Sequence, residues 1–335
     1  MDLLLGAIKP IVDRRNEEDA VDRLNYQYTA YVYTFASLLI MSKMYMGHSI
    51  ACWTPAEFKK GWIEYTMDYC LVENTYWWPI EDASLPDVAH REKAELPYYQ
   101  WVQFVLVILA FFFTLPHYLW RSLNWHSGVQ VRSIVNECVG TLGKPKERDA
   151  TIGKVAKHIH HAFARLDDLK ARGKLNILQS MTNGQTVTLY YLLMKLLYLV
   201  NLAVQIIILH VFLGFNPLLV LWRGWNGDWK TSGLFPRSTM CDFEVRTKGN
   251  IQRYSVQCVL SLNMFNEKIF AALFVWLLIL TVITVGSTIR WLIFTYSSSQ
   301  RRSLVQRMLK SQGVTPGERS QQGEKQKLLE DEKSR

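Results

Sequence analysis

Four long stretches of this 335-residue chain contain no aspartate, glutamate, lysine or arginine. They are Leu24–Ser42, Leu96–Trp120, Leu196–Trp222 and Ile269–Ile289. A helix needs about 20 mostly apolar residues to cross a bilayer, and all four stretches are near or above that length. The absence of charge from four separate runs argues against buried helices of a large soluble core. It predicts a membrane protein with four spans.

Acidic residues are absent from the middle of every predicted span. Ion-coupled transporters usually keep one there, so this absence argues against that class. The chain also lacks a Gly-x-Ser-x-Gly motif, and Gly140–Lys144 lacks the spacing of a phosphate-binding loop. We therefore predict that the protein is not an enzyme and has no cofactor.

Histidine and cysteine do not form a recognisable metal-binding motif. His158, His160 and His161 miss the i, i+4 spacing of a helical metal pair, so we interpret them as a solvated helix face and predict no metal site. Cys138 stands alone in the middle loop, where an idle thiol is the simpler interpretation. The roles of these four residues stay open.

No Asn-x-Ser/Thr sequon occurs anywhere in the chain. Bulky glycans on the outer loops would obstruct contact between cells. Their absence permits such contact without proving it.

Four of the five cysteines are divided between two loops. Cys52 and Cys70 lie between the first two spans, and Cys241 and Cys258 lie between the last two. With four spans these two loops share one side of the membrane, and four thiols on an oxidising exterior predict two disulfides. Four cysteines allow three pairings, and the spacing alone does not choose among them.

Basic residues orient the chain. The N-terminal segment, middle loop and tail hold 24 lysines and arginines against 16 acids, whereas the two cysteine-bearing loops hold 11 against 13. A basic excess marks the cytoplasmic side, so both termini and the middle loop are predicted inside. The cations are spread over three separate segments, which argues against a nucleic-acid partner.

The predicted fold is an all-α membrane protein, a four-transmembrane-helix bundle with disulfide-stapled extracellular loops and a helical cytoplasmic loop. The predicted order is an N-terminal cytoplasmic segment (1–27), first span (28–47), first outer loop (48–100), second span (101–119), cytoplasmic loop (120–186), third span (187–213), second outer loop (214–268), fourth span (269–295) and a cytoplasmic tail (296–335) that is disordered at its end.

Three features of the spans and their flanks stand out. The N-terminal residues have apolar side chains at helical spacing, which fits either a leader at the lipid headgroups or a helix folded back into a pore. Lys195 is the deepest charge in any span and is a candidate pore or interhelix residue. Pro116 lacks the N–H that would bond to the carbonyl of Phe112, so a kink is expected in the second span.

The residues before and at the start of the second span, Tyr98, Tyr99, Gln100, Trp101 and Val102, resemble the signature of the innexins, the invertebrate gap-junction proteins. Further stretches agree in order around the four spans, namely Cys52–Phe58, Tyr69–Cys70, Asn74–Tyr76, Ser232–Gly233, Phe235–Arg237, Cys241–Phe243, Val256–Leu260 and Asn263–Lys268. The resemblance covers about residues 20–295 and is weak in the middle loop.

The resemblance implies a channel of the plasma membrane, located at gap junctions. Subunits of the same or of related chains would form a ring of about eight in the lipid bilayer and dock with a ring on the neighbouring cell. Ions and small metabolites would then pass between cytoplasms. The implied disulfides are Cys52–Cys258 and Cys70–Cys241, which link the two outer loops. The N-terminal helix would line the pore, which makes Asp2, Leu5 and Lys9 pore-lining candidates beside Lys195.

Two alternatives remain. One is a hemichannel that does not dock, like the pannexins, and releases small molecules to the exterior. The other is a four-span adhesion or scaffold protein without a pore. The first outer loop lacks the Trp-x-x-Trp-type pattern of claudins and the Cys-Cys-Gly of tetraspanins, which disfavours the second.

Overall fold

The computed structural model describes residues 18–47, 49–79, 85–126, 131–141, 145–171, 186–214, 233 and 235–311. The chain divides into two compact units, Met1–Thr284 and Val285–Arg335, which are described separately. The pore-lining candidates Asp2, Leu5 and Lys9 lie outside the described residues, as does the end of the tail that is predicted to be disordered.

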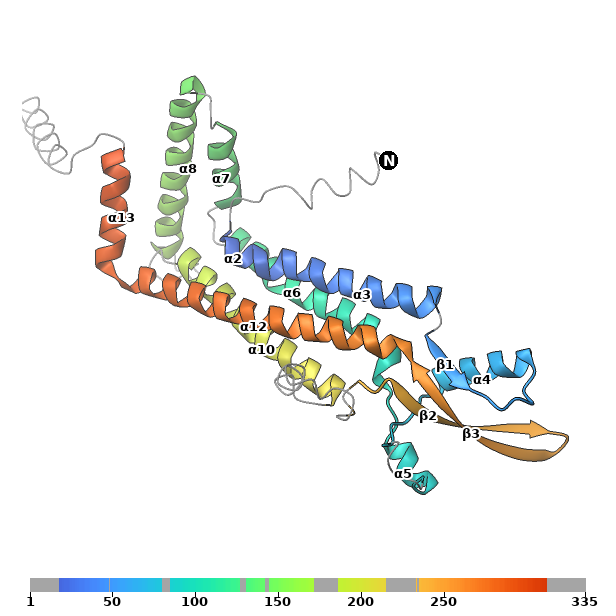
Figure 1. The fold of residues 1–335 in the computed structure, drawn as a ribbon. Helices are drawn as coiled ribbons and strands as arrows, with labels where there is room; N and C mark the ends of the chain where they lie inside the picture. The colour runs from blue at the N-terminus through green and yellow to red at the C-terminus, as the bar shows by residue number, and fades with distance from the viewer. Residues whose placement is uncertain are drawn as a thin grey trace, which may run out of the picture. The chain divides into compact units, whose positions relative to one another are not determined.

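Long helices form the body of the first unit (Figure 1). The first helical run joins α2 (Ala20–Arg23), the π-helical turn η1 (Leu24–Tyr28) and α3 (Thr29–Met46) without a break. It is followed by α6 (Val102–His126), α10 (Thr186–Leu213) and α12 (Ser261–Tyr296), and α6 packs against both α3 and α10. The shared core contains Tyr33, Ile40, Leu106, Phe113, Leu202, Phe270 and Phe274.

Polar contacts tie α12 to the first helical run. The indole of Trp276 donates to the hydroxyl of Thr29 at 3.1 Å, and the amide of Asn25 donates to the hydroxyl of Thr284 at 2.9 Å. Asn25 and Thr284 are both fully buried, so this bond satisfies polar atoms that would otherwise be costly in the interior.

Within the described part of the chain, three helical segments are long and apolar enough to cross a membrane: Val102–Leu123, Val187–Leu213 and Ser261–Tyr296. The predicted first span, α3, is not among them because its 18 residues include Lys43 and several tyrosines, serines and threonines, which lower the mean hydropathy. Its outer face is nevertheless apolar, since Phe35, Leu38 and Leu39 are 64%, 57% and 46% exposed. Such a face needs lipid or another protein to cover it, which suits a fourth membrane-crossing helix.

Two of the helices extend beyond the predicted spans. Helix α6 continues to His126, and α12 begins at Ser261, eight residues before the apolar stretch that was predicted from Ile269. The hydrogen-bonded helix has no reason to end where the hydrocarbon ends, so span length and helix length differ. Pro116 lies inside α6, which is assigned as one helix through that position.

The middle region is helical, as predicted, with α7 (Val131–Gly140) and α8 (Pro145–Ala171). Cys138 and the three histidines His158, His160 and His161 are exposed on these helices. The second unit contains the last turns of α12 and the helix α13 (Ser298–Ser311).

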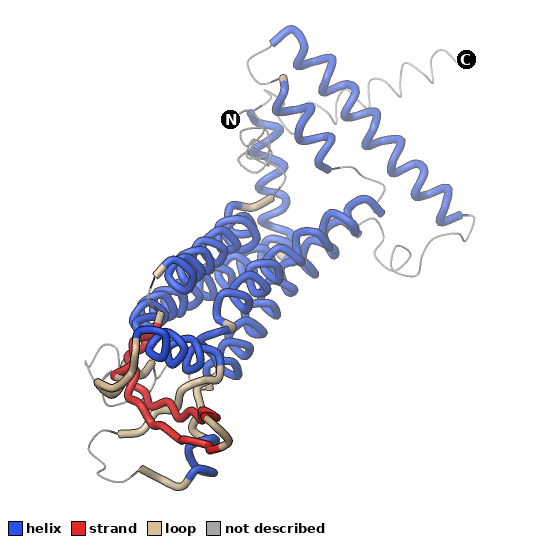
Figure 2. Tube along the Cα trace, turned by 90° about the vertical axis from the view of Figure 1, so that its right-hand side faces the viewer, coloured by secondary structure: helices blue, strands red, loops and turns tan. Residues whose placement is uncertain are grey.

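A small sheet, which the sequence analysis did not predict, lies at one end of the helices (Figure 2). Strands β1 (Ile50–Trp53), β2 (Ser238–Thr247) and β3 (Asn250–Leu260) pair antiparallel in the order β1-β3-β2. The first outer loop also forms α4 (Lys60–Val72), α5 (Val88–Lys93) and the 3-10 turn η2 (Tyr98–Gln100). We call these six elements the cap.

The longest feature of the cap is the β2–β3 hairpin. Its two-residue turn is Lys248–Gly249, and both residues have positive φ, at 50° and 88°. This is the conformation of a type I′ turn, whose twist matches that of the strands and which favours glycine at its second position. The hairpin therefore has a defined register from Thr247–Asn250 down to Ser238–Val259.

Candidate functional site

Two disulfides join the outer loops within the cap. Cys52 of β1 is bonded to Cys258 of β3, directly opposite it in the sheet register. Cys70 of α4 is bonded to Cys241 of β2. Each bond therefore connects the first outer loop to the second, in the pairs that the innexin resemblance implies. The first closes a strand pair, and the second ties a helix to the sheet.

The two disulfides are immediate neighbours. The sulfur atoms of Cys52, Cys70 and Cys258 all lie within 4.8 Å of one another. Cys70, Cys241 and Cys258 are buried and Cys52 is half-buried. Among the described residues this is the one cluster whose atoms are close enough to hold a metal ion. All of its sulfurs are in disulfides and are therefore not available as thiolate ligands.

Within the Tyr98–Val102 stretch, the side-chain amide of Gln100 bonds to the end of α4. Its nitrogen lies 3.0 Å from the carbonyl oxygen of Leu71, 2.8 Å from that of Val72 and 2.9 Å from the side-chain oxygen of Asn74. Leu71 and Val72 form the end of α4, where helix carbonyls lack intrahelical partners. Gln100 thus provides hydrogen bonds to the last carbonyl groups of α4, the helix that carries Cys70.

The other residues of that stretch pack between the cap and the bundle. Tyr98, Tyr99 and Val102 are buried, and the Tyr99 hydroxyl lies 3.4 Å from the carbonyl oxygens of Cys70 and Leu71. Trp101 is 59% exposed and points away from this packing. The stretch therefore fixes the start of α6 against α4, so the position of the cap depends on it.

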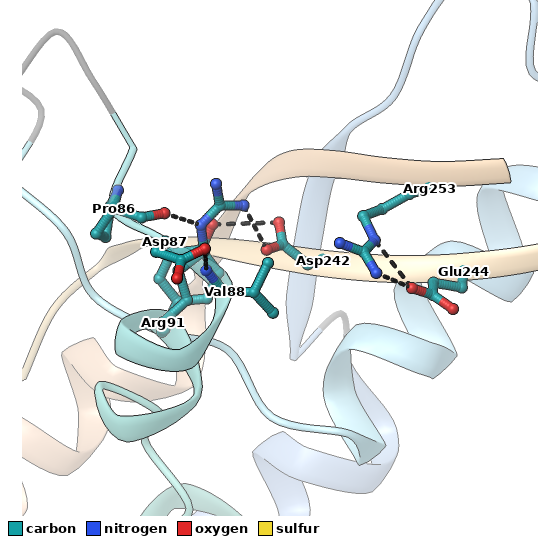
Figure 3. A network of polar contacts seen from close by, with 8 residues as sticks. Pro86, Asp87, Val88, Arg91, Asp242, Glu244 and Arg253 are labelled. Carbon is teal, nitrogen blue, oxygen red and sulfur yellow. Dashed lines mark hydrogen bonds and ion pairs between the residues drawn. The ribbon is translucent and has the colours of Figure 1, made fainter.

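The edge of β2 that faces away from β3 is held by a polar network (Figure 3). Tyr76 exchanges two backbone hydrogen bonds with Met240, at 2.9 and 2.8 Å, and its hydroxyl donates to Asp242 at 3.2 Å. Arg91 of α5 donates to the other oxygen of Asp242 at 2.8 Å and to the carbonyl of Pro86 at 2.6 Å. Asp242 thereby connects β2 to two separate parts of the first outer loop.

The cap tyrosines Tyr76 and Tyr99 have pKa values well above neutral pH, and burial raises them further. Burial raises the pKa of both to about 12, and for Tyr76 the negative charge of Asp242 adds to the effect. Both hydroxyls therefore stay protonated at neutral pH and act as donors. The hydrogen bond from Arg91 to Asp242 in turn raises the pKa of the Arg91 guanidinium, which remains charged.

Aromatic side chains fill the space between α4 and the hairpin. Phe58 and Phe243 both contact Tyr254, with ring centroids 5.2 and 5.5 Å apart. Beside them Phe58, Trp62, Tyr65, Phe243 and Tyr254 line an apolar cavity of about 210 Å³. Trp62 and Tyr65 are each 51% exposed. This part of the cap presents an aromatic surface to the outside.

The second outer loop is also held to the start of α12. Asn263 is buried and donates from its side chain to the carbonyl of Pro236 at 2.8 Å. Arg237 forms an ion pair with Glu267 at 2.9 Å. At Gly233, which has φ of +66°, a Cβ atom would lie 3.0 Å from the ring of Trp77. These contacts give a structural reason for three of the stretches that resemble innexins.

A second cluster lies at the opposite end of the bundle from the cap. Lys195 of α10 is fully buried and forms an ion pair with Asp22 at 2.6 Å, with Asp19 at 3.4 Å. The Tyr191 hydroxyl donates to the second oxygen of Asp22 at 2.7 Å. We call Glu18, Asp19, Asp22, His117, Tyr191 and Lys195 the inner charge cluster.

The same cluster contains a contact between a histidine and a glutamate. The Nδ1 atom of His117 in α6 lies 2.7 Å from Glu18, and both side chains are buried. The ring of Tyr26 stacks on His117 with centroids 4.1 Å apart. The residues just before α3 are thus bound to α6 through Glu18 and to α10 through Asp22. Lys195 makes an interhelix contact and has no exposed surface in the single chain.

Sequence analysis missed the acidic half of this cluster. Glu18, Asp19 and Asp22 belong to the N-terminal segment that was interpreted as either a leader at the lipid headgroups or a helix folded back into a pore, without buried ion pairs. The available signal was Lys195 itself, because a buried ammonium group requires a carboxylate partner and the predicted spans offered none at mid-depth.

The chain is similar to one known protein family over most of its length. Residues 18–331 match the family model described as Innexin. The chain is 38% identical to innexin unc-9 of Caenorhabditis elegans over 303 residues, which are 88% of this chain and 78% of that protein. It is 36% identical to innexin eat-5 (92% and 75% covered) and 38% identical to innexin-3 (90% and 75% covered), both of the same organism.

Proposed function

Because the chain belongs to the innexin family and is therefore a subunit of a gap-junction channel, we propose that it forms a ring of about eight subunits that docks with a second ring on the adjacent cell. Innexins are four-span membrane proteins and channels, not enzymes. The permeants in this proposal are ions and small metabolites that pass from one cytoplasm to the other.

The cap is the observation that carries the docking proposal. Ordering a flexible loop on contact costs about 1–2 kcal/mol per residue in conformational entropy. Here two disulfides, a three-stranded sheet and the Asp242 network already order the described parts of the outer loops. A rigid face of this kind loses little further entropy when it meets another cap.

Ring assembly is supported by exposed apolar side chains on the membrane helices. On α3 these include Tyr31, Phe35 and Leu38, and on α10 they include Leu196, Val200 and Ile207. In a bilayer such faces contact lipid or neighbouring subunits. We propose that part of this surface is the contact between adjacent subunits.

The proposed orientation places the cap outside and both termini in the cytoplasm. Two observations support it independently. Disulfides persist in an oxidising compartment, which suits an extracellular cap. The segments on the other side hold 24 basic against 16 acidic residues, as expected for the cytoplasmic face. The proposed location is the plasma membrane at gap junctions.

The proposed domain limits keep the predicted ones, with residues 1–27 as an N-terminal segment that lines the pore. Asp2, Leu5 and Lys9 would then face the permeating ions. The inner charge cluster supports this role, because it fixes residues 18–22 to α6 and α10 and so defines where the preceding segment starts. In this proposal Lys195 is a positioning residue for that segment.

Paired cells that express only this chain test the proposal. Junctional conductance between two such cells is measured together with the membrane current of single cells. The expected result is coupling between the pair, which requires a docking ring of one subunit type. Current in single cells without coupling would instead identify a non-docking hemichannel. If neither junctional conductance nor single-cell current is detected, although the protein is at the surface, the result would contradict a channel made of this chain alone.

A further inference from the structure

The last helix, α13, lies where lipid headgroups are expected. About 20 residues cross the hydrocarbon core, so a span that starts near Ile269 ends near Ile289. The next turns of α12 carry Trp291, Phe294 and Tyr296, and Tyr296 is 80% exposed. Aromatic residues of this kind concentrate at the membrane–water boundary. The end of α12 therefore lies at that boundary.

The chain changes direction directly after this point. Ser297 interrupts the helix, and its hydroxyl accepts a hydrogen bond from the backbone N–H of Gln300 at 3.4 Å at the start of α13. Both α13 and the last turns of α12 belong to the same compact unit. Within this unit, Figure 1 shows α13 running across the direction of the last turns of α12. A change of direction at the membrane boundary suits a helix that lies along the membrane surface.

The charge of α13 has one sign. It contains Arg301, Arg302, Arg307 and Lys310, and the chain has no acidic residue between Glu267 and Glu318. Arg301, Arg302 and Arg307 are exposed, and within the described residues none of the three has an acidic partner. Helix α8 differs, since its basic residues alternate with Glu147, Asp149, Asp167 and Asp168. An ordinary solvated helix has that mixed pattern.

An apolar stripe accompanies these charges. Leu304 is 40% exposed, and by sequence Val305, Met308 and Leu309 share its side of the helix, with Arg301 on the same side and Lys310 opposite. Basic residues combined with an apolar stripe, directly after a membrane span, are the features of a helix that lies in an anionic lipid surface.

We propose that α13 is a binding site for the headgroups of anionic phospholipids in the cytoplasmic leaflet. The arginines contact lipid phosphates, and the apolar stripe enters the upper acyl region. This binding holds the inner end of α12 at the membrane surface. The assignment to the cytoplasmic leaflet rests on the orientation given under the proposed function.

Purified full-length channels in neutral detergent provide the test. Binding of a fluorescent phosphatidylserine is compared with that of the matching phosphatidylcholine, with free phosphoserine as a competitor. The test variant is Arg301→Gln/Arg302→Gln/Arg307→Gln. The matched control removes three exposed charges from α8, as Lys154→Gln/Lys157→Gln/Arg165→Gln. Size-exclusion chromatography confirms that each variant retains the assembly of the unmodified protein.

Each basic side chain near an anionic surface contributes about fivefold to binding, so the loss of three arginines is expected to weaken phosphatidylserine binding about hundredfold. Phosphatidylcholine binding and the α8 control should not change. Equal losses in both variants, or no loss in the α13 variant, would overturn the proposal. So would displacement of the lipid by free phosphoserine at similar concentrations, because that identifies a phosphate site without a membrane role.

A protein ligand is a separate outcome. Basic amphipathic helices also bind calmodulin. Calcium-dependent calmodulin binding that the α13 variant abolishes, without phosphatidylserine binding by the unmodified channel, would replace the lipid proposal. The lipid measurement does not require docking, so its result is independent of junctional conductance. Failure of the docking proposal and failure of the lipid proposal are therefore distinguishable.

Discussion

At the scale of single residues, the inner charge cluster makes Lys195 sensitive to substitution. Lys195→Met leaves Asp22 buried without its ion-pair partner, and breaking one side of a buried pair costs about 3–5 kcal/mol. We expect a lower unfolding temperature for the purified channel, measured by the loss of the assembled peak on size-exclusion chromatography after heating.

The matched controls separate charge from volume. The double variant Lys195→Met/Asp22→Leu removes both charges and should recover most of the lost stability, because apolar replacement of a whole buried pair is often neutral. Lys43→Met removes a lysine that contacts the ring of Phe265 and should change little. A double variant as unstable as Lys195→Met would contradict the ion-pair explanation.

Among the cysteines, closeness of the two disulfides predicts exchange between them. Cys258→Ser leaves Cys52 as a free thiol within 4.8 Å of Cys70. Its thiolate can attack the Cys70 sulfur, which forms a Cys52–Cys70 bond and releases Cys241 as the free thiol. Peptide mapping of the oxidised variant should detect that new bond.

Removal of both members of the pair is the control for this exchange. In Cys52→Ser/Cys258→Ser no attacking thiol remains beside Cys70, so Cys70–Cys241 should persist unchanged. If Cys258→Ser also retains only Cys70–Cys241, the Cys52 thiol does not attack that disulfide, and the predicted exchange is wrong.

At the scale of elements, α4 depends on a residue from a different part of the loop. Gln100→Leu removes the amide that bonds to the carbonyls of Leu71 and Val72. Leaving such acceptors without a partner costs about 1–3 kcal/mol each if they are buried, and less where water reaches them. We expect faster hydrogen exchange at the end of α4 and a lower melting temperature.

A glutamine elsewhere in the cap gives the comparison. Gln257→Leu removes an exposed side-chain bond to Ser238 and should have little effect on either measurement. Equal effects of the two variants would show that Gln100 has no special role in ending α4.

The elements also show what a sequence can and cannot predict here. The spans follow from runs without charge, and the helical middle loop follows from its periodicity. The sheet was missed because β1 pairs with β3 across 206 residues of sequence, and a four-residue strand such as Ile50–Trp53 has no distinctive alternation. The cysteines signalled that the two loops are linked, but only the family resemblance implied which pairs form.

Burial of the inner charge cluster was missed for a related reason. Glu18 and Asp22 are far from their partners in sequence, since His117 and Lys195 lie on two different helices. Hydropathy treats each segment alone and therefore assigns such charges to solvent. Only the contacts of Glu18 with His117 of α6 and of Asp22 with Lys195 of α10 show that they are interior.

At the scale of the whole molecule, the proposed function requires that both ends of the subunit be organised. The cap presents an ordered outer face, and the inner charge cluster fixes the residues that precede the first membrane helix. Within the first unit, α3, α6 and α10 connect these two regions. In this proposal, an innexin subunit carries its docking part and its pore-lining part on one bundle.

The measurement that tests the docking face most directly is junctional conductance between paired cells that express the unmodified chain or Cys70→Ser/Cys241→Ser. That variant releases α4 from β2 and retains Cys52–Cys258. Surface biotinylation and chromatography establish equal amounts of assembled protein. A stapled docking face predicts coupling by the unmodified chain and no junctional current from the variant. Coupling by the variant at the unmodified level would contradict it.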